Sequence, residues 1–164
     1  MRGATLERVA WGDERAVALR RQLDVEMAER YGTGAGREPA DLTAKRARAL
    51  AVRHSDVVLT LLAVADDGTP AGHIALRRLG EEWEVKRLAV LADYRRRGIA
   101  AALLDAVEDE ARRGGAPRLI LQAGEQQPEA LALYESRGWT PIPVYEPYVE
   151  TMPRSRCFEK VLPA

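Results

Sequence analysis

Cysteine and aromatic residues are scarce in this 164-residue chain, and neither sign of charge is in excess. The single cysteine, Cys157, excludes an internal disulfide and a metal site built from several cysteines, and it fits a reducing compartment. Lysine plus arginine and aspartate plus glutamate number 25 each, so no overall positive field favours nucleic acid or an acidic membrane. No stretch approaches the roughly 18 apolar residues of a membrane span, and the first residues do not resemble a signal peptide. We therefore expect a cytoplasmic protein that binds neither nucleic acid nor membranes.

The commonest phosphate-binding loops are also missing. No glycine loop is followed by Gly-Lys-Ser or Gly-Lys-Thr, which excludes a P-loop. The dinucleotide-binding fingerprint needs three spaced glycines before a helix, and the best candidate helix start offers only Gly98.

What is present is an ordinary globular balance, with 46% hydrophobic and 30% charged residues. The length suits one domain with one core, which we expect to cover residues 1–164. Apolar residues recur at helical spacing over 13–31, and a second short helix is expected over 40–50. The glycine-rich segment 32–39 between them is expected to be a flexible loop.

Beyond residue 56 the pattern changes to that of strands. Strands are predicted over 57–64, 71–79, 82–91, 118–122, 139–144 and 156–162, and helices over 98–113 and 128–137. In the third strand the alternation predicts two faces: Trp83, Val85, Arg87 and Ala89 on one, and Glu84, Lys86, Leu88 and Val90 on the other. This order predicts an α/β (α+β) fold, a mixed, mostly antiparallel central sheet of about six or seven strands covered by about four helices.

The junction between residues 90 and 104 carries the clearest functional signal. A strand runs into a loop, and a helix then starts at Gly98 beside the small residue Ala100. The first amide groups of a helix have no partner within it, and the helix dipole adds partial positive charge there. A helix start flanked by small residues is therefore a site for a phosphate or pyrophosphate.

Here the chain resembles the GCN5-related N-acetyltransferase (GNAT) family. The acetyl-CoA signature of that family is Gln or Arg, two residues, Gly, one residue, then Gly or Ala, and residues 95–100 fit it. Residues 127–139 look like its second signature, a polar residue followed by Ala, Leu-Tyr and a Gly-aromatic pair. The resemblance covers roughly residues 57–162.

The resemblance implies an acetyl-CoA-dependent N-acetyltransferase, in which a primary amine of a small molecule or peptide directly attacks the thioester. Acetyl-CoA is then a co-substrate, and no metal is implied. The alternative is a non-catalytic acetyl-CoA-binding regulatory module on the same fold. Nucleic-acid binding through Arg95, Arg96 and Arg97 is a weaker alternative, because the chain has no net charge.

The family's donor site maps onto the strand end, the helix start and the second signature. The implied cofactor-binding residues are Leu88, Ala89, Val90, Arg95, Arg96, Arg97, Gly98, Ile99, Ala100, Ala101, Gln127 and Tyr134. Free backbone groups near Val90 would pair with the pantetheine arm and polarise the thioester carbonyl. Gln127 departs from the asparagine often found at its place, and which arginine meets the CoA phosphates is open.

Two catalytic residues follow from the resemblance. Tyr134 matches the tyrosine that acts as general acid towards the departing CoA thiolate, and its other interpretation is a core aromatic residue. Glu84 lies eleven residues before Arg95, where some family members have a general base that deprotonates the amine. Its other interpretation is an ion pair with Lys86.

Several residues are expected to play lesser parts, and some questions stay open. His54 and His73 are expected to be surface or turn residues, and Cys157 a packed strand residue near the site. The loops 32–39 and 145–153 are expected to shape the acceptor pocket or merely to cover it, with Glu146 and Glu150 suited to a cationic amine. The acceptor stays open, as does assembly into a homodimer.

Overall fold

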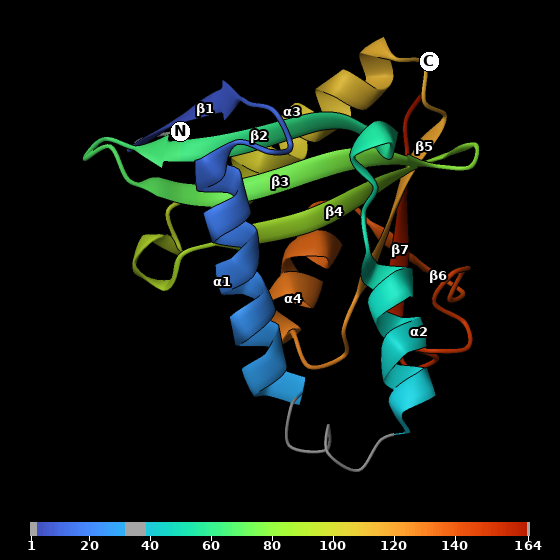
Figure 1. Cartoon of the computed structure of the whole chain (residues 1–164). Helices are drawn as coiled ribbons and strands as arrows, with labels where there is room; N and C mark the ends of the chain where they lie inside the picture. Colours follow the sequence, from blue (N-terminus) through green and yellow to red (C-terminus); the bar gives the residue numbers. More distant parts are fainter. Residues whose placement is uncertain (1–2, 32–38, 164) are drawn as a thin grey trace.

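Three consecutive apolar stretches form an antiparallel meander at the centre of the sheet (Figure 1). They are β2 (Val57–Ala65), β3 (Pro70–Leu79) and β4 (Glu82–Val90). Branched and apolar residues favour these strands, and a short turn at Gly80 and Glu81 joins β3 to β4. The computed structural model describes residues 3–31 and 39–163.

Four further strands complete a seven-stranded sheet within the described residues. They are β1 (Ala4–Arg8), β5 (Arg118–Ala123), β6 (Thr140–Ile142) and β7 (Arg156–Val161). The strand order is β1-β2-β3-β4-β5-β7-β6, and all neighbours are antiparallel except β4 and β5. β1 was not predicted, because five residues with a mixed pattern become a strand only by pairing with β2.

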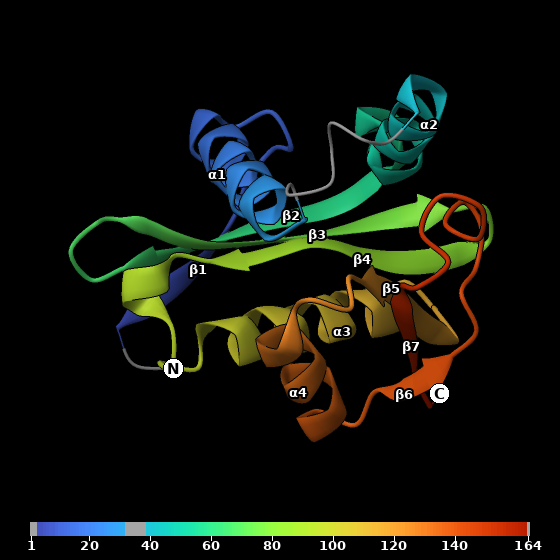
Figure 2. The same ribbon diagram turned by 90° about the horizontal axis from the view of Figure 1, so that it is seen from below.

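The helices cover both faces of the sheet, as Figure 2 shows. α1 (Glu14–Tyr31) and α2 (Ala40–Leu50) lie on one face, whereas α3 (Ile99–Arg113) and α4 (Pro128–Ser136) lie on the other. Because β4 and β5 are parallel, α3 serves as the crossover between them. The expected fold class, a mixed and mostly antiparallel sheet covered by four helices, is confirmed for the described residues.

The main core lies between the sheet and the two helices α3 and α4. α3 contributes Ile99, Leu103, Leu104, Val107 and Ala111, which recur at helical spacing and are buried. A much smaller cluster of Ala16, Leu19 and Leu62 joins α1 to the opposite face. The face beneath α1 and α2 is therefore less filled with apolar side chains than the face beneath α3 and α4.

A β-bulge in β4 breaks the predicted alternation of its side chains. The register with β3 shifts between His73, which pairs with Ala89, and Ala75, which pairs with Lys86. Arg87 occupies the left-handed region at φ 58°. Leu88 and Val90 consequently pack in the main core with Val85. The prediction that they share a face with Glu84 and Lys86 was wrong, since an extra residue reverses the facing.

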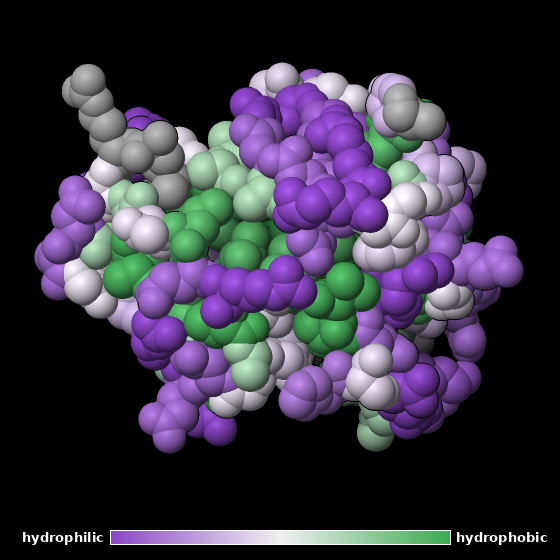
Figure 3. Space-filling model, turned by 90° about the horizontal axis from the view of Figure 1, so that it is seen from above, coloured by the Kyte–Doolittle hydropathy of each residue, from purple (hydrophilic) through white to green (hydrophobic). Residues whose placement is uncertain are grey.

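The β1 edge of the sheet carries charged side chains (Figure 3). Glu7 pairs with Arg15 at 3.1 Å, and Arg8 pairs with Glu110 at 3.3 Å. Charges of this kind hinder pairing of an edge strand with another chain. Among the described residues, no helix is long and apolar enough to cross a membrane.

Candidate active site

The two parallel strands at the centre of the sheet separate soon after they meet. β4 and β5 pair only at Glu84 with Ile120 and at Val85 with Leu121. The bulge at Arg87 lies within β4, two residues after Val85, the last residue that pairs with β5. From Lys86 onward, the edge of β4 that faces β5 is not paired with a strand. The carbonyls of Arg87 and Val90 accept side-chain hydrogen bonds from His73 and Arg95, and the other backbone groups of this edge can be reached by a ligand.

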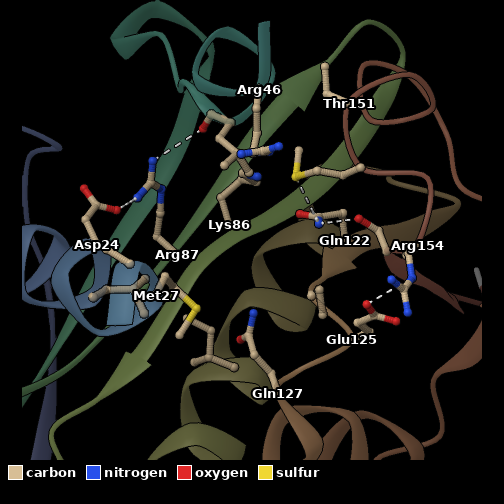
Figure 4. Close-up of a pocket in the computed structure, with 18 of the residues that line it drawn as sticks. Asp24, Met27, Arg46, Lys86, Arg87, Gln122, Glu125, Gln127, Thr151 and Arg154 are labelled. Carbon is tan, nitrogen blue, oxygen red and sulfur yellow. Dashed lines mark hydrogen bonds and ion pairs between the residues drawn. The ribbon is translucent and has the colours of Figure 1, made fainter. Parts of the chain in front are cut away.

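A cavity of about 680 Å³ opens beside this separation (Figure 4). Its described walls are Leu23, Asp24, Met27, Ala28, Arg46, Leu50, Lys86, Arg87, Leu88, Gln122, Ala123, Gly124, Glu125, Gln127, Tyr134, Thr151, Met152, Pro153, Arg154 and Ser155. These residues come from α1, α2, β4, β5, α4 and the segment before β7, so the cavity reaches elements on both faces of the sheet. Its volume is that of a pocket for a small molecule.

The start of α3 is shaped by two residues with positive φ. Gly98 precedes the helix at φ 80° and Arg96 lies at φ 64°. Among the described residues, no acceptor takes the amide hydrogens of residues 98–101, and no side chain caps the helix. An anion can therefore approach these amides without displacing an existing bond.

The three arginines before α3 have different surroundings. Arg95 donates to the carbonyl of Val90 at 3.0 Å and to both carboxylate oxygens of Glu26 at 2.9 and 3.1 Å. Arg97 donates to the carbonyl of Asp93, and its guanidinium lies 5.0 Å from the ring centre of Tyr94. Arg96 is exposed and its guanidinium has no partner in the described part of the chain.

Tyr134 is both a core residue and a wall of the cavity. Its ring lies 6.0 Å from that of Trp139 and 5.8 Å from that of Phe158, so its position is fixed by packing. Its hydroxyl group has no hydrogen-bond partner among the described residues. Burial raises the pKa of this hydroxyl, so it keeps its proton across the physiological range.

The other predicted donor-site residues divide between wall and core. Leu88 and Gln127 line the cavity, and Gln127 immediately precedes α4. Ala89 and Val90 pair with β3 through their backbones but do not line the cavity with their side chains. Ile99 is buried in the main core, which leaves only its backbone for a ligand.

Glu84 is fully buried and does not line the cavity. It accepts hydrogen bonds from Arg77 Nε at 2.8 Å, from the Tyr145 hydroxyl at 2.6 Å and from the Tyr148 hydroxyl at 2.9 Å. The expected alternative, an ion pair with Lys86, was wrong, because Arg77 is the residue directly opposite on β3. The two-residue turn between β3 and β4 fixes this register, so the sequence contained a signal for the pair.

Lys86 connects the Glu84 cluster to the cavity. Its side chain is only 6% exposed, and its ammonium donates to the Tyr148 hydroxyl at 2.9 Å. Burial lowers its pKa to about 8, and the nearby Glu84 acts in the opposite direction. At neutral pH Lys86 is therefore still mainly an ammonium group.

The loop before β7 contributes to the cavity by only part of its length. Thr151, Met152 and Pro153 line it, whereas Glu146 and Glu150 do not. Glu150 instead pairs with Lys45 of α2 at 3.0 Å. Residues 32–38 of the other loop lie outside the described residues. Cys157 is buried in β7, as expected for a packed strand residue.

His73 is fully buried in β3 and was wrongly expected at the surface or in a turn. Its Nδ1 lies 2.7 Å from the carbonyl oxygen of Arg87, and its Nε2 lies 3.0 Å from Arg20 Nη1. Burial, together with the charges of Arg20 and Arg87, lowers its pKa to about 4. The neutral imidazole thus donates to Arg87 and accepts from Arg20. His54 is exposed, as expected.

The described residues show no group of three His, Cys, Asp or Glu side chains that could hold a metal ion. The site instead offers unpaired amides at a helix start, an unpaired strand edge and a tyrosine hydroxyl beside a cavity. Each of these groups is open to a ligand.

Comparisons with known proteins identify the family of this chain. A family model described as the acetyltransferase (GNAT) family matches residues 20–139. The chain therefore belongs to the GNAT acetyltransferase family, as its two sequence signatures predicted.

Individual relatives show the same resemblance. The chain is 38% identical over 77 residues to an IAA acetyltransferase of Azospirillum brasilense, a match that covers 47% of this chain and 50% of that protein. The chain thus matches about half the length of that curated relative. A protein assigned as an acyl-CoA N-acyltransferase from Klebsiella pneumoniae has 27% identity and a TM-score of 0.74, with 97% of each chain covered. A GNAT family acetyltransferase from Elizabethkingia anophelis, solved with acetyl-CoA bound, has 16% identity and a TM-score of 0.68 over 99% of this chain and 100% of that one.

Proposed function

We propose that this chain transfers the acetyl group of acetyl-CoA to a primary amine of a small molecule or peptide. The observation that carries the proposal is the cavity of about 680 Å³ where β4 separates from β5, with Tyr134 in its wall. Acetyl-CoA, when bound, supplies an acetyl group activated as a thioester. The proposal treats residues 1–164 as one domain, and the cytoplasmic location expected from the sequence stays a prediction.

The start of α3 would hold the diphosphate of the donor. The amides of Gly98, Ile99, Ala100 and Ala101 supply hydrogen-bond donors, and Arg96 supplies a positive charge that no described residue uses. Arg95 would act indirectly, because its contacts with Glu26 and Val90 tie the loop to α1 and β4. Arg97 would support the loop through Asp93 and Tyr94.

The unpaired edge of β4 would hold the arm of the donor. Backbone groups of Leu88 to Val90 lie beyond the last pairing with β5. Gln127 would contribute its side-chain amide from the start of α4. An amide that hydrogen-bonds the reacting carbonyl in a dry site lowers the barrier by roughly 3–4 kcal/mol.

Tyr134 is the proposed general acid. Its raised pKa keeps the hydroxyl protonated, and without an internal partner this group is free to give its proton to the departing sulfur. A thiol with an ordinary pKa of about 8.5 needs only a weak acid to leave.

Glu84 is the proposed general base, but its burial restricts how it can act. It can take a proton from the cavity only through a relay, in which Tyr148 gives a proton to Glu84 and receives one from Lys86. Lys86 is neutral once its proton has passed to Tyr148, and its amino group would then rotate to take the proton of the bound amine and become an ammonium group again. This relay gives the buried carboxylate a route to the reacting amine.

The test combines binding with turnover. Calorimetry should detect acetyl-CoA and CoA, and thiol release should follow when a panel of primary amines is added with acetyl-CoA. Binding without thiol release for any amine would instead support the non-catalytic acetyl-CoA-binding module. A protein that is folded but binds neither CoA nor acetyl-CoA would refute both.

A further inference from the structure

The cavity wall contains an ammonium group that is buried but incompletely bonded. Lys86 is 6% exposed and makes one hydrogen bond, to the neutral hydroxyl of Tyr148 at 2.9 Å. An ammonium has three hydrogens, so two remain for a ligand on the cavity side. Leaving a buried charge without a counterpart is costly, which makes an anionic ligand favourable here.

The carboxylate nearest to Lys86 is already engaged elsewhere. Glu84 accepts hydrogen bonds from Arg77, Tyr145 and Tyr148. Tyr148 in turn accepts from both Lys86 and Arg77, at 2.9 and 3.3 Å, while it donates to Glu84. No described group in this cluster is left to bond the remaining hydrogens of Lys86.

The charges of the wall also favour an anion. The described wall has four cationic side chains, Arg46, Lys86, Arg87 and Arg154, and two carboxylates, Asp24 and Glu125. Asp24 pairs with Arg87, and Glu125 pairs with Arg154 at 3.2 Å. Figure 4 shows both Lys86 and Arg46 away from Glu125 and Arg154. Both carboxylates are thus paired with other cations, and a cationic ligand would find no free counterpart in the described wall.

The rest of the acceptor side is apolar. It is formed by Leu23, Met27 and Ala28 of α1, by Leu50 of α2 and by Met152 and Pro153 of the segment before β7. Flexible methionine side chains adapt to apolar groups of different shape. A ligand that fits this wall has an apolar body as well as a negative group.

We propose that the acceptor is a primary amine that also carries a carboxylate and an apolar side chain, as an apolar amino acid does, and that Lys86 binds the carboxylate. The inference rests on the proposed acetyltransferase function and specifies its substrate class. The carboxylate bonds the two hydrogens of Lys86 that Tyr148 leaves, and the apolar side chain packs against α1 and α2. Polycationic amines are poor acceptors, because the ammonium of Lys86 repels them.

Matched acids and amides test the inference through turnover. The probes are L-phenylalanine and L-methionine, their primary amides, and spermidine. For Lys86→Met the ratio of kcat/KM for acid over amide should fall by about tenfold to a hundredfold, as expected for a lost charge-assisted hydrogen bond. The amine of an amino-acid amide is less basic than that of the acid, and this difference affects the ratio in every variant alike. Only the change of the ratio between the wild type and Lys86→Met therefore reports on the carboxylate. Lys86→Arg should restore much of the ratio, and Lys45→Met, on the surface of α2, should leave it unchanged.

Binding tests the inference without turnover. N-acetyl-L-phenylalanine and its amide, titrated into the CoA-saturated protein, should differ in affinity for the wild type and Lys86→Arg but not for Lys86→Met. Equal affinity of acid and amide for the wild type, or an unchanged preference in Lys86→Met with native circular dichroism, would overturn the inference. Preferred turnover of spermidine would overturn it too, while leaving the acetyltransferase proposal intact. A wild type that releases no thiol with any amine refutes the proposed function, and the titration still decides the carboxylate preference.

Discussion

His73 of β3 donates a hydrogen bond of 2.7 Å to the carbonyl oxygen of Arg87, the residue at the bulge of β4. Arg20 of α1 occupies the other ring nitrogen at 3.0 Å and lies 3.5 Å from the ring centre of Trp11. One buried imidazole thus ties α1 to the place where β4 departs from regular pairing. Since this departure lies beside the cavity, we expect His73 to position the proposed donor site.

Replacing His73 by Phe should destabilise the fold and weaken donor binding together. Phe keeps a ring beside Trp11 but leaves the Arg87 carbonyl and the Arg20 guanidinium without this partner. We expect the free energy of unfolding to fall by about 1–3 kcal/mol, the usual effect of leaving a buried polar group unsatisfied. Urea denaturation and acetyl-CoA calorimetry measure the two effects. His54→Phe, at an exposed position, is the control, and an unchanged acetyl-CoA affinity in folded His73→Phe would refute the positioning role.

The same histidine should make stability depend on pH. Its pKa is about 4 in the folded protein against an ordinary 6.5, because burial and the neighbouring Arg20 and Arg87 disfavour the imidazolium. Between these values the unfolded chain binds a proton that the folded chain does not, so stability is lost as the pH falls from 6.5 to about 4. The loss at this site is about 3 kcal/mol by linkage.

Denaturation at several pH values checks this dependence. At each pH the free energy of unfolding of His73→Phe is subtracted from that of the wild type. The subtraction removes the contribution of carboxylates whose pKa is lowered in the folded state, such as Asp13 and Glu110, and leaves that of His73. The difference in free energy of unfolding between the two proteins should become smaller as the pH falls from 6.5 towards 4. A constant difference over this range would contradict the buried neutral imidazole.

Most strands and all four helices could be predicted from the sequence, because each carries a local pattern. The helix predicted over 98–113 is Ile99–Arg113, and the strand predicted over 82–91 is Glu82–Val90. β1 could not be predicted, since its partner β2 lies some fifty residues away. The family signatures also located the start of α3, and Tyr134 in the wall of the cavity.

The bulge and its supports could not be predicted, for a physical reason. Arginine is not typical of the left-handed region, so nothing at Arg87 marks a bulge in the sequence. The contacts that hold it come from His73 and Asp24, each on another element. Burial of His73 likewise depends on the packing of α1, which a lone histidine in a strand does not reveal.

Gly98→Ala should weaken donor binding beyond its effect on stability. Gly98 has φ 80° and Gly80 has φ 58°, and a Cβ at either position meets no atom within 4 Å. Alanine at each position should therefore cost about 1–2 kcal/mol through backbone strain alone. Gly80→Ala is the matched control, because Gly80 lies in the turn between β3 and β4. Only Gly98→Ala should lower the acetyl-CoA affinity measured by calorimetry, and equal affinity in both variants would argue against phosphate binding at α3.

Glu84→Gln should separate structural from catalytic contributions of the buried carboxylate. Losing the charge leaves Arg77 buried without its counterion, and the free energy of unfolding should fall by about 3–5 kcal/mol. If Glu84 also receives the proton, kcat/KM of the folded variant at low temperature should fall about a hundredfold. Arg77→Met breaks the same pair but keeps the carboxylate, and should retain more of the rate at matched stability. A folded Glu84→Gln variant with the wild-type kcat/KM would remove the base role.

Tyr134→Phe should lower turnover while leaving both the fold and donor binding intact. The ring is held by Trp139 and Phe158, and the hydroxyl has no described hydrogen-bond partner, so its removal disrupts no internal contact. The loss of a general acid should reduce kcat by about a hundredfold. Because burial raises the pKa of Tyr134, the wild type should show no alkaline loss of activity from this residue below its ordinary pKa of 10.0. Thiol release measured between pH 6 and about 9.5 checks both expectations. Trp139→Phe, which alters the packing but keeps the hydroxyl, should retain most of the rate, and an undiminished kcat in Tyr134→Phe would leave the proton of the leaving thiol to be supplied by water.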